Sequence, residues 1–132
     1  MVNLYIGQRH IGNVSVLDLK GRVRIGGTTL ALHRSIGCLV LEGKTQILLN
    51  LDGVTHIDST GLGELIASRM TVNRKGGEMK LCHLTDQLRD LMTLTRTLAV
   101  FDVYDDESEA LASFAGDVSV ARQPLAFVTQ SK

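Results

Sequence analysis

The chain of 132 residues contains no tryptophan, a single proline and few aromatic residues, so its core must be built mainly from leucine, isoleucine and valine. Its two cysteines, Cys38 and Cys82, are too few for a disulfide framework, and we expect both to be reduced thiols. The N-terminus lacks the apolar run of a signal peptide, and no stretch reaches the roughly 20 apolar residues that a membrane span needs. These absences predict a cytoplasmic protein that does not insert into a membrane.

An excess of either charge is also absent, because 14 lysine and arginine residues balance 14 aspartate and glutamate residues. A broad basic surface for nucleic acid is therefore not expected. Hydrophobic residues make up 44% of the chain and charged residues 21%, which are ordinary values for a globular protein with a buried core. The length suits one domain and is too short for two.

Apolar runs typical of strands alternate with helical patterns along the chain. The predicted strands cover residues 14–19, 46–51, 78–83 and 100–104, and each is followed by a stretch of helical periodicity. The second of these runs, at 46–51, is typical of a strand buried on both faces. Strands that alternate with helices predict a single α/β domain with about four helices and a mixed, mostly parallel sheet.

The domain boundaries follow from the same pattern. Residues 12–115 form the predicted domain, residues 1–11 an N-terminal segment that can add an antiparallel edge strand, and residues 116–132 a C-terminal tail. We expect Gly21 to turn the chain after the first predicted strand and Asp52-Gly53 to break the second one. The helix that follows is predicted by apolar residues at helical spacing: Leu62, Leu65, Ile66 and Met70.

The segment Asp58-Ser59-Thr60-Gly61 lies where a predicted strand gives way to a helix. The N-terminus of a helix presents unpaired N–H groups and a partial positive charge, so it accommodates a phosphate without any lysine or arginine. A hydroxyl there can be phosphorylated, which adds a charge of about −1.5 to −2 and changes what the surface binds. A serine or threonine at this place also commonly caps the helix. The residues alone leave both interpretations open.

The stretch Asp58-Ser59-Thr60-Gly61-Leu62-Gly63 resembles the signature of STAS domains in bacterial anti-sigma factor antagonists. Four other segments follow the order of that family: Gly21, Asn50-Leu51, Gly76-Gly77-Glu78-Met79 and Glu109-Ala110-Leu111. The resemblance covers residues 12–115. It implies the STAS fold and a protein that binds partners without catalysing a reaction.

The resemblance also implies a phosphorylation site at Ser59, because in that family the first hydroxyl residue after the aspartate accepts a phosphate. The unphosphorylated protein would bind an anti-sigma factor, a serine kinase of the GHKL type, and release a sigma factor. Phosphorylation would end the binding, and a phosphatase would restore it. The kinase supplies ATP and Mg²⁺, so no cofactor is expected in this chain. The expected partner-binding residues are those of the motif, Asp58, Ser59, Thr60, Gly61, Leu62 and Gly63, together with Arg22 and Arg24.

Residues 21–24 depart from the pattern of this family. Members phosphorylated by these kinases usually read Gly-Glu-hydrophobic-Asp after the first strand, where this chain has Gly21-Arg22-Val23-Arg24. We expect this loop to lie close to Ser59. Its two arginines either bind a phosphate or an acidic partner residue through charge-assisted hydrogen bonds, or are solvated at the surface. The departure leaves open which kinase acts and whether phosphorylation reverses binding in the usual way.

The resemblance leaves a second function open. STAS domains also act as structural subunits, either in signalling scaffolds or beside an ATPase in lipid-transport complexes. In such a complex the surface around Ser59 would be a constant contact surface and not a switch. The sequence does not decide the oligomeric state, and a homodimer remains open.

Enzymatic and metal sites are not predicted. His56, Asp58 and Ser59 include the residue types of a hydrolase triad, but neighbours on an extended strand point to alternate faces, and no G-x-S-x-G elbow is present. A phosphate-binding G-x-x-x-x-G-K-[ST] loop is absent too. The four histidines are scattered singly and are not expected to hold a metal: His10, His33, His56 and His83.

Overall fold

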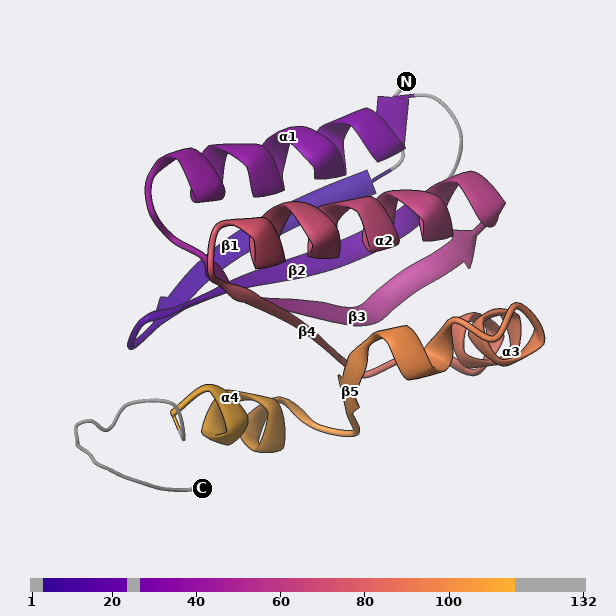
Figure 1. Ribbon diagram of the computed structural model, residues 1–132. Helices are drawn as coiled ribbons and strands as arrows, with labels where there is room; N and C mark the ends of the chain where they lie inside the picture. Colours follow the sequence, from indigo (N-terminus) through magenta and orange to yellow (C-terminus); the bar gives the residue numbers. More distant parts are fainter. Residues whose placement is uncertain (1–3, 24–26, 116–132) are drawn as a thin grey trace.

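The fold is seen in a computed structural model that describes residues 4–23 and 27–115 (Figure 1). Arg24 and residues 116–132, which the sequence assigns to the site and to a C-terminal tail, lie outside the described residues. The strands are β1 (Leu4–Ile11), β2 (Val14–Val23), β3 (Gln46–Ile57), β4 (Glu78–Cys82) and β5 (Asp102–Tyr104). The helices are α1 (Gly27–Leu41), α2 (Ser59–Arg74), α3 (Asp86–Leu94), the short 3₁₀ helix η1 (Leu98–Val100) and α4 (Glu107–Ala115).

The five strands form one sheet in the order β1-β2-β3-β4-β5. β1 pairs antiparallel with β2, and the remaining neighbours are parallel. Each parallel connection crosses over through a helix, as the alternation of strands and helices predicts. The prediction of a single α/β domain with a mixed, mostly parallel sheet is confirmed.

Two apolar cores lie on the two faces of the sheet. The larger core is formed by one face of the sheet together with α1, α2 and α3, and it includes Leu17, Leu49, Leu32, Leu65 and Leu88. The smaller core lies under α4 on the opposite face, and its buried members are Val14, Val16, Leu48, Cys82, Ala110 and Phe114. β3 contributes to both cores, which explains its apolar run at 46–51.

Two local predictions are wrong, because the first two parallel strands continue past the expected turn residues. Gly21 lies inside β2, and Asp52-Gly53 lies inside β3. The ladder between the strands continues to Val23 and Ile57 through two register shifts. A Cβ atom on Gly53 would lie only 2.6 Å from Cγ of Lys20 and 3.0 Å from the carbonyl oxygen of Leu19. These glycines therefore permit a close irregularity within the ladder, where the sequence suggested a chain break.

The residues that α2 buries differ in part from those that the apolar pattern predicts. Leu62 and Leu65 are buried as the spacing predicts, but Met70 is 51% exposed. Ser68 and Val72 are buried instead, because they continue the helical period of Leu62 and Leu65. The outward face of α2 consequently carries a large apolar residue.

Candidate functional site

The predicted site lies where β2 and β3 end side by side and α2 begins (Figure 1). Val23 and Ile57 form the last pair of the ladder, and the backbone N–H of Asp58 donates to the carbonyl oxygen of Val23 over 3.3 Å. Residues 58–63 are therefore held at the carboxyl end of two parallel strands, a common location for binding sites in open α/β sheets.

Asp58 is the N-cap of α2. Its backbone is extended, with φ of −112° and ψ of −176°, and its Oδ1 accepts a hydrogen bond from the backbone N–H of Gly61 over 2.8 Å. The capping role that the sequence left open for the serine therefore belongs to the aspartate. Ser59 is the first residue of the helix, and both Ser59 and Thr60 are exposed. Within the described residues, the hydroxyl of Ser59 makes no hydrogen bond, so it is available to another molecule.

The fold requires glycine at position 61 but not at position 63. A Cβ atom on Gly61 would overlap the carbonyl oxygen of Val23 and would lie 2.8 Å from the carbonyl carbon of the same residue. The close approach of β2 thus requires glycine at position 61. A Cβ atom on Gly63 would meet nothing within 4 Å, and Gly63 is exposed. The fold does not require the second glycine, whose effect is to leave a bare patch on the outer surface of α2.

The remaining predicted partner-binding residues divide into buried and exposed ones. Leu62 is buried in the larger core, where it anchors the first turn of α2. Arg22 lies in β2 opposite His56 of β3, next to the end of the ladder, and is partly exposed. It forms no ion pair within the described residues. The accessible part of the helix start is therefore formed by Ser59, Thr60 and Gly63. The side chain of Arg22 lies on the other face of the sheet, because Val23 next to it packs in the larger core under α2.

The residue types of a hydrolase triad serve local structure here. Nδ1 of His56 lies 3.2 Å from Oγ1 of Thr55, and Thr55 in turn donates to the carbonyl oxygen of Gly21 over 3.1 Å. The carboxylate of Asp58 caps α2. Its contact to the backbone of Gly61 assigns this group to the helix start and not to an imidazole relay.

Glu64 fixes the first two turns of α2 to α1. Its Oε2 accepts a hydrogen bond from Oγ of the buried Ser68 over 2.9 Å and lies 3.2 Å from Nδ1 of His33 in α1. The two helices lie side by side on the same face of the sheet (Figure 1). The surface around Ser59 and Gly63 is therefore presented by a helix that is held at its cap, its core face and its flank.

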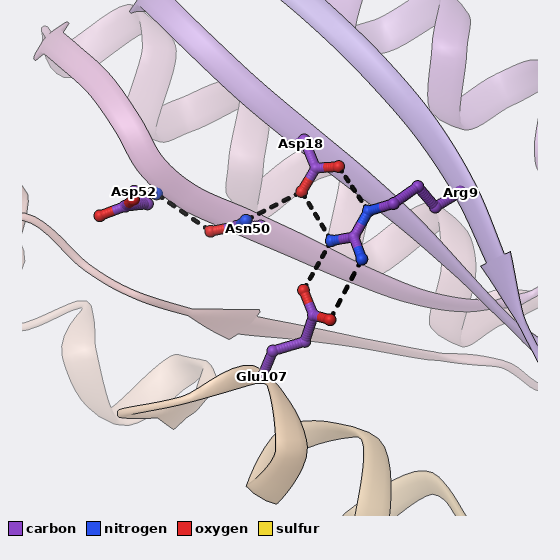
Figure 2. Close-up of polar contacts among 5 residues, drawn as sticks. All are labelled: Arg9, Asp18, Asn50, Asp52 and Glu107. Atoms are coloured by element: carbon purple, nitrogen blue, oxygen red, sulfur yellow. Dashed lines mark hydrogen bonds and ion pairs between the residues drawn. The ribbon is translucent and has the colours of Figure 1, made fainter.

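A polar cluster on the opposite face of the sheet was not found from the sequence (Figure 2). Nε and Nη2 of Arg9 donate to both oxygens of Asp18 over 2.7 and 2.8 Å, and its Nη1 and Nη2 donate to Glu107 of α4 over 3.1 and 2.6 Å. Nδ2 of Asn50 donates to Oδ1 of Asp18 over 2.8 Å. The hydrogen bonds from Arg9 hold the pKa of the Asp18 carboxyl below its ordinary value. The cluster ties α4 to β1, β2 and β3.

Lys80 holds the other end of α4. Its side chain is buried, its Nζ donates to Oγ of Ser113 over 2.9 Å, and the same atom lies 4.7 Å from the centre of the Phe114 ring. A cation close to the last turn of a helix is favoured by the partial negative charge there. Arg9 and Lys80 thus give α4 a structural role that does not involve the Ser59 surface.

Two further classes of site find no support in the described part of the chain. No three histidine, cysteine, aspartate or glutamate side chains gather there as metal ligands. No helix among the described residues is both long and apolar enough to cross a membrane.

Comparison with known families identifies the domain. The family model for the STAS domain matches residues 5–110. The chain belongs to the STAS domain family. The resemblance carried by residues 58–63 is thereby confirmed at the level of the family.

Relatives of this STAS domain carry names that describe one kind of regulator. The chain is 26% identical over 110 residues to the anti-sigma F factor antagonist of Paenibacillus polymyxa, covering 83% of this chain and 94% of the relative. An anti-sigma factor antagonist from Mycobacterium paratuberculosis has a similar structure, with a TM-score of 0.71 at 23% identity over 83% of this chain and 92% of that one. The phosphorylated form of the Bacillus cell fate determinant SpoIIAA gives a TM-score of 0.66 at 16% identity over 83% and 99%.

The two solved structures share the fold of this STAS domain, and the curated relative extends the similarity to nearly its whole length. The expectation of a binding protein and not an enzyme agrees with the name of the curated relative.

Proposed function

We propose that this STAS protein is an anti-sigma factor antagonist that binds an anti-sigma factor through the surface around Ser59, and that phosphorylation of Ser59 switches the binding off. The observation that carries the proposal is the position of Ser59. It is an exposed hydroxyl in the first turn of α2, beside a cap supplied by Asp58. The names of the curated relatives supply the class of partner.

A phosphate on Ser59 is compatible with the folded domain. It would sit at the N-terminal end of α2, where the helix dipole favours negative charge. Because Asp58 and not Ser59 supplies the cap, modification leaves the hydrogen bond to Gly61 in place. The domain therefore stays folded when it is modified, and the effect of the phosphate falls on the partner.

Loss of binding then follows from the charge of the phosphate. A group carrying about −1.5 to −2 charges, placed at the centre of a contact surface, must be desolvated or must push the partner away. Burial of a charge without a matching cation on the partner costs several kcal/mol. The partner consistent with this cycle is a serine kinase of the GHKL type that binds the hydroxyl form and modifies it, with a phosphatase for the reverse step.

Arg22 adds a positive charge near the end of β2. It forms no ion pair among the described residues, and β2, the strand that carries it, pairs with β3. A partner that reaches past the end of β2 would meet this guanidinium favourably with an acidic contact group. We therefore expect Arg22→Glu to weaken binding of the unmodified protein.

Affinity measurements on charge variants test the proposal. Ser59→Asp is expected to weaken binding to the anti-sigma kinase at least about tenfold, and Ser59→Ala is expected to bind as the unmodified protein does. Gln87→Asp is the matched control, because Gln87 is exposed in the first turn of another helix, α3. If Ser59→Asp binds as tightly as Gln87→Asp, the surface is a constant contact, as in a scaffold or a transport complex, and the switch is refuted.

A further inference from the structure

The outer edge of β1 is the long exposed edge of the sheet. β1 has eight residues and pairs with β2 on one side, and no strand pairs with its other side among residues 4–23 and 27–115 (Figure 1). The opposite edge of the sheet, β5, has only three residues. An edge strand directs part of its backbone N–H and C=O groups away from the sheet, where they are free to pair with another strand.

β1 lacks the features that usually prevent such pairing. Protected edges are short, irregular or interrupted by proline, or they carry charged side chains, above all lysine. β1 contains neither proline nor lysine, and its register with β2 is regular over all eight residues. The charge of Arg9 is already satisfied by Asp18 and Glu107. The edge is therefore suited to pairing.

Two large apolar side chains are exposed on this strand. Tyr5 is 64% exposed and Ile11 is 40% exposed. Because side chains alternate along a strand, both lie on the face that carries Arg9 and α4. The ring of Tyr5 lies over Gly7, since a Cβ atom there would be 3.3 Å from Cε2 of Tyr5. The ring of Tyr5 therefore lies along β1 near the start of the strand, and Ile11 is the last residue of the strand.

We propose that β1 pairs antiparallel with β1 of a second copy of this chain, which joins two five-stranded sheets into one. A twofold axis perpendicular to the sheet keeps each residue on its own face, so residues opposite each other must share a face. Centring the pairing on Gln8 satisfies this condition and places Tyr5 opposite Ile11 of the second copy, twice in the dimer. The two exposed apolar residues of the strand then cover each other.

The same register is compatible with the charges of the strand. It places Gly7 opposite Arg9 and Ile6 opposite His10, so no two cationic side chains face each other. Centring on Gly7 instead would place Tyr5 opposite Arg9 and would leave Ile11 without an opposite residue in β1. We therefore infer that the partner of this edge is a second copy of the chain. In this register two β1 strands can share backbone hydrogen bonds, cover each other's exposed apolar side chains and keep cationic side chains apart.

The proposed interface is separate from the Ser59 surface. β2 lies between β1 and β3, and Ser59 follows β3. The dimer therefore presents two Ser59 surfaces, and the proposal stands or falls independently of the anti-sigma function.

Sedimentation velocity of the full chain over a wide concentration range tests the dimer. The unmodified protein is expected to dimerise, and Tyr5→Lys is expected to raise the dissociation constant at least about tenfold. Leu94→Lys is the matched control, because Leu94 is an apolar residue that is 82% exposed on α3. A monomeric unmodified protein, or equal effects of the two lysine substitutions, would overturn the proposal.

Cysteine cross-linking tests the register independently. In a Cys38→Ser background, which removes the exposed native thiol, Gln8→Cys is expected to form a disulfide-linked dimer on mild oxidation, because residue 8 faces its own copy. His10→Cys lies on the same strand and faces Ile6 of the second copy, so it is expected to remain unlinked. Linking of both variants to the same extent, or of His10→Cys alone, would contradict the pairing centred on Gln8.

Discussion

Substitutions of Gly63 are expected to affect the stability of the fold and the binding of a partner in opposite directions. The reason is that no other residue lies where a side chain at position 63 would be. A Cβ atom on Gly63 would have nothing within 4 Å. Alanine is more favourable than glycine in a helix interior by about 0.5–1 kcal/mol, so Gly63→Ala is expected to raise the free energy of unfolding by that amount. Gly61→Ala is expected to lower it by at least about 1–3 kcal/mol, because the added methyl group overlaps the backbone of Val23.

Binding is expected to change in the direction opposite to stability. If the partner docks closely on Ser59, Thr60 and Gly63, a methyl group at position 63 holds it away from the helix. We expect Gly63→Ala to weaken binding about tenfold, which corresponds to about 1.4 kcal/mol, and Gly63→Leu to weaken it more. Gly37→Ala in α1 is the control, because Gly37 also has nothing within 4 Å and lies in another helix. It is expected to stabilise the fold and to leave binding unchanged.

Urea denaturation and isothermal titration with the anti-sigma partner measure the two quantities on the same preparations. The reasoning is refuted if Gly63→Ala and Gly37→Ala stabilise the domain equally and bind the partner equally well. That outcome would show that the partner does not contact the outer surface of α2.

Two further predictions concern the side of the molecule that carries α4. Arg9→Met is expected to lower the free energy of unfolding by about 1 kcal/mol at neutral pH, because the partly exposed guanidinium bridges Asp18 and Glu107. The folded pKa of Asp18 is lowered, so this contribution is complete above the unfolded value of about 3.9 and is lost as pH falls through the folded one. Urea midpoints of the two proteins should therefore converge in acid, and a constant difference would contradict the assignment. Burial raises the pKa of Cys82 to about 12, whereas Cys38 is exposed. A disulfide reagent should modify one thiol of the native protein and two in urea, and rapid labelling of both thiols in the native state would contradict the burial of Cys82.

The pKa of Cys82 also predicts a loss of stability in alkali. Between the unfolded thiol value of about 8.5 and the folded value of about 12, the unfolded chain loses a proton that the native chain keeps. Stability is therefore expected to fall as pH rises through this window, and Cys82→Ala is expected to remove that part of the slope.

The sequence predicts the larger features of the fold because they depend on local periodicity. The alternation of strand and helix patterns leads directly to the parallel sheet, and the apolar run at 46–51 predicts a strand with cores on both faces. Local periodicity fails at Gly21 and Asp52-Gly53, where residues typical of turns lie inside strands. The long ladder between β2 and β3 determines the conformation there, and a ladder is not visible in one segment alone.

The sequence predicts where residues 58–63 lie in the fold, but not which structural role each of them has. The motif at residues 58–63 places the hydroxyls at the start of a helix, yet only the structure shows that Asp58 is the cap and that Gly61 and Gly63 differ. Arg9 and Glu107 are 98 positions apart in the sequence, so no short-range pattern predicts their contact.

The central claim is tested most directly by measuring the affinity of the anti-sigma kinase for this protein before and after it has been phosphorylated by that kinase, with the modified residue located by mass spectrometry. The account predicts a single phosphate on Ser59 and a loss of affinity of at least about tenfold, with Ser59→Ala neither phosphorylated nor weakened. A phosphate on another residue, or equal affinities for the two forms, would contradict it.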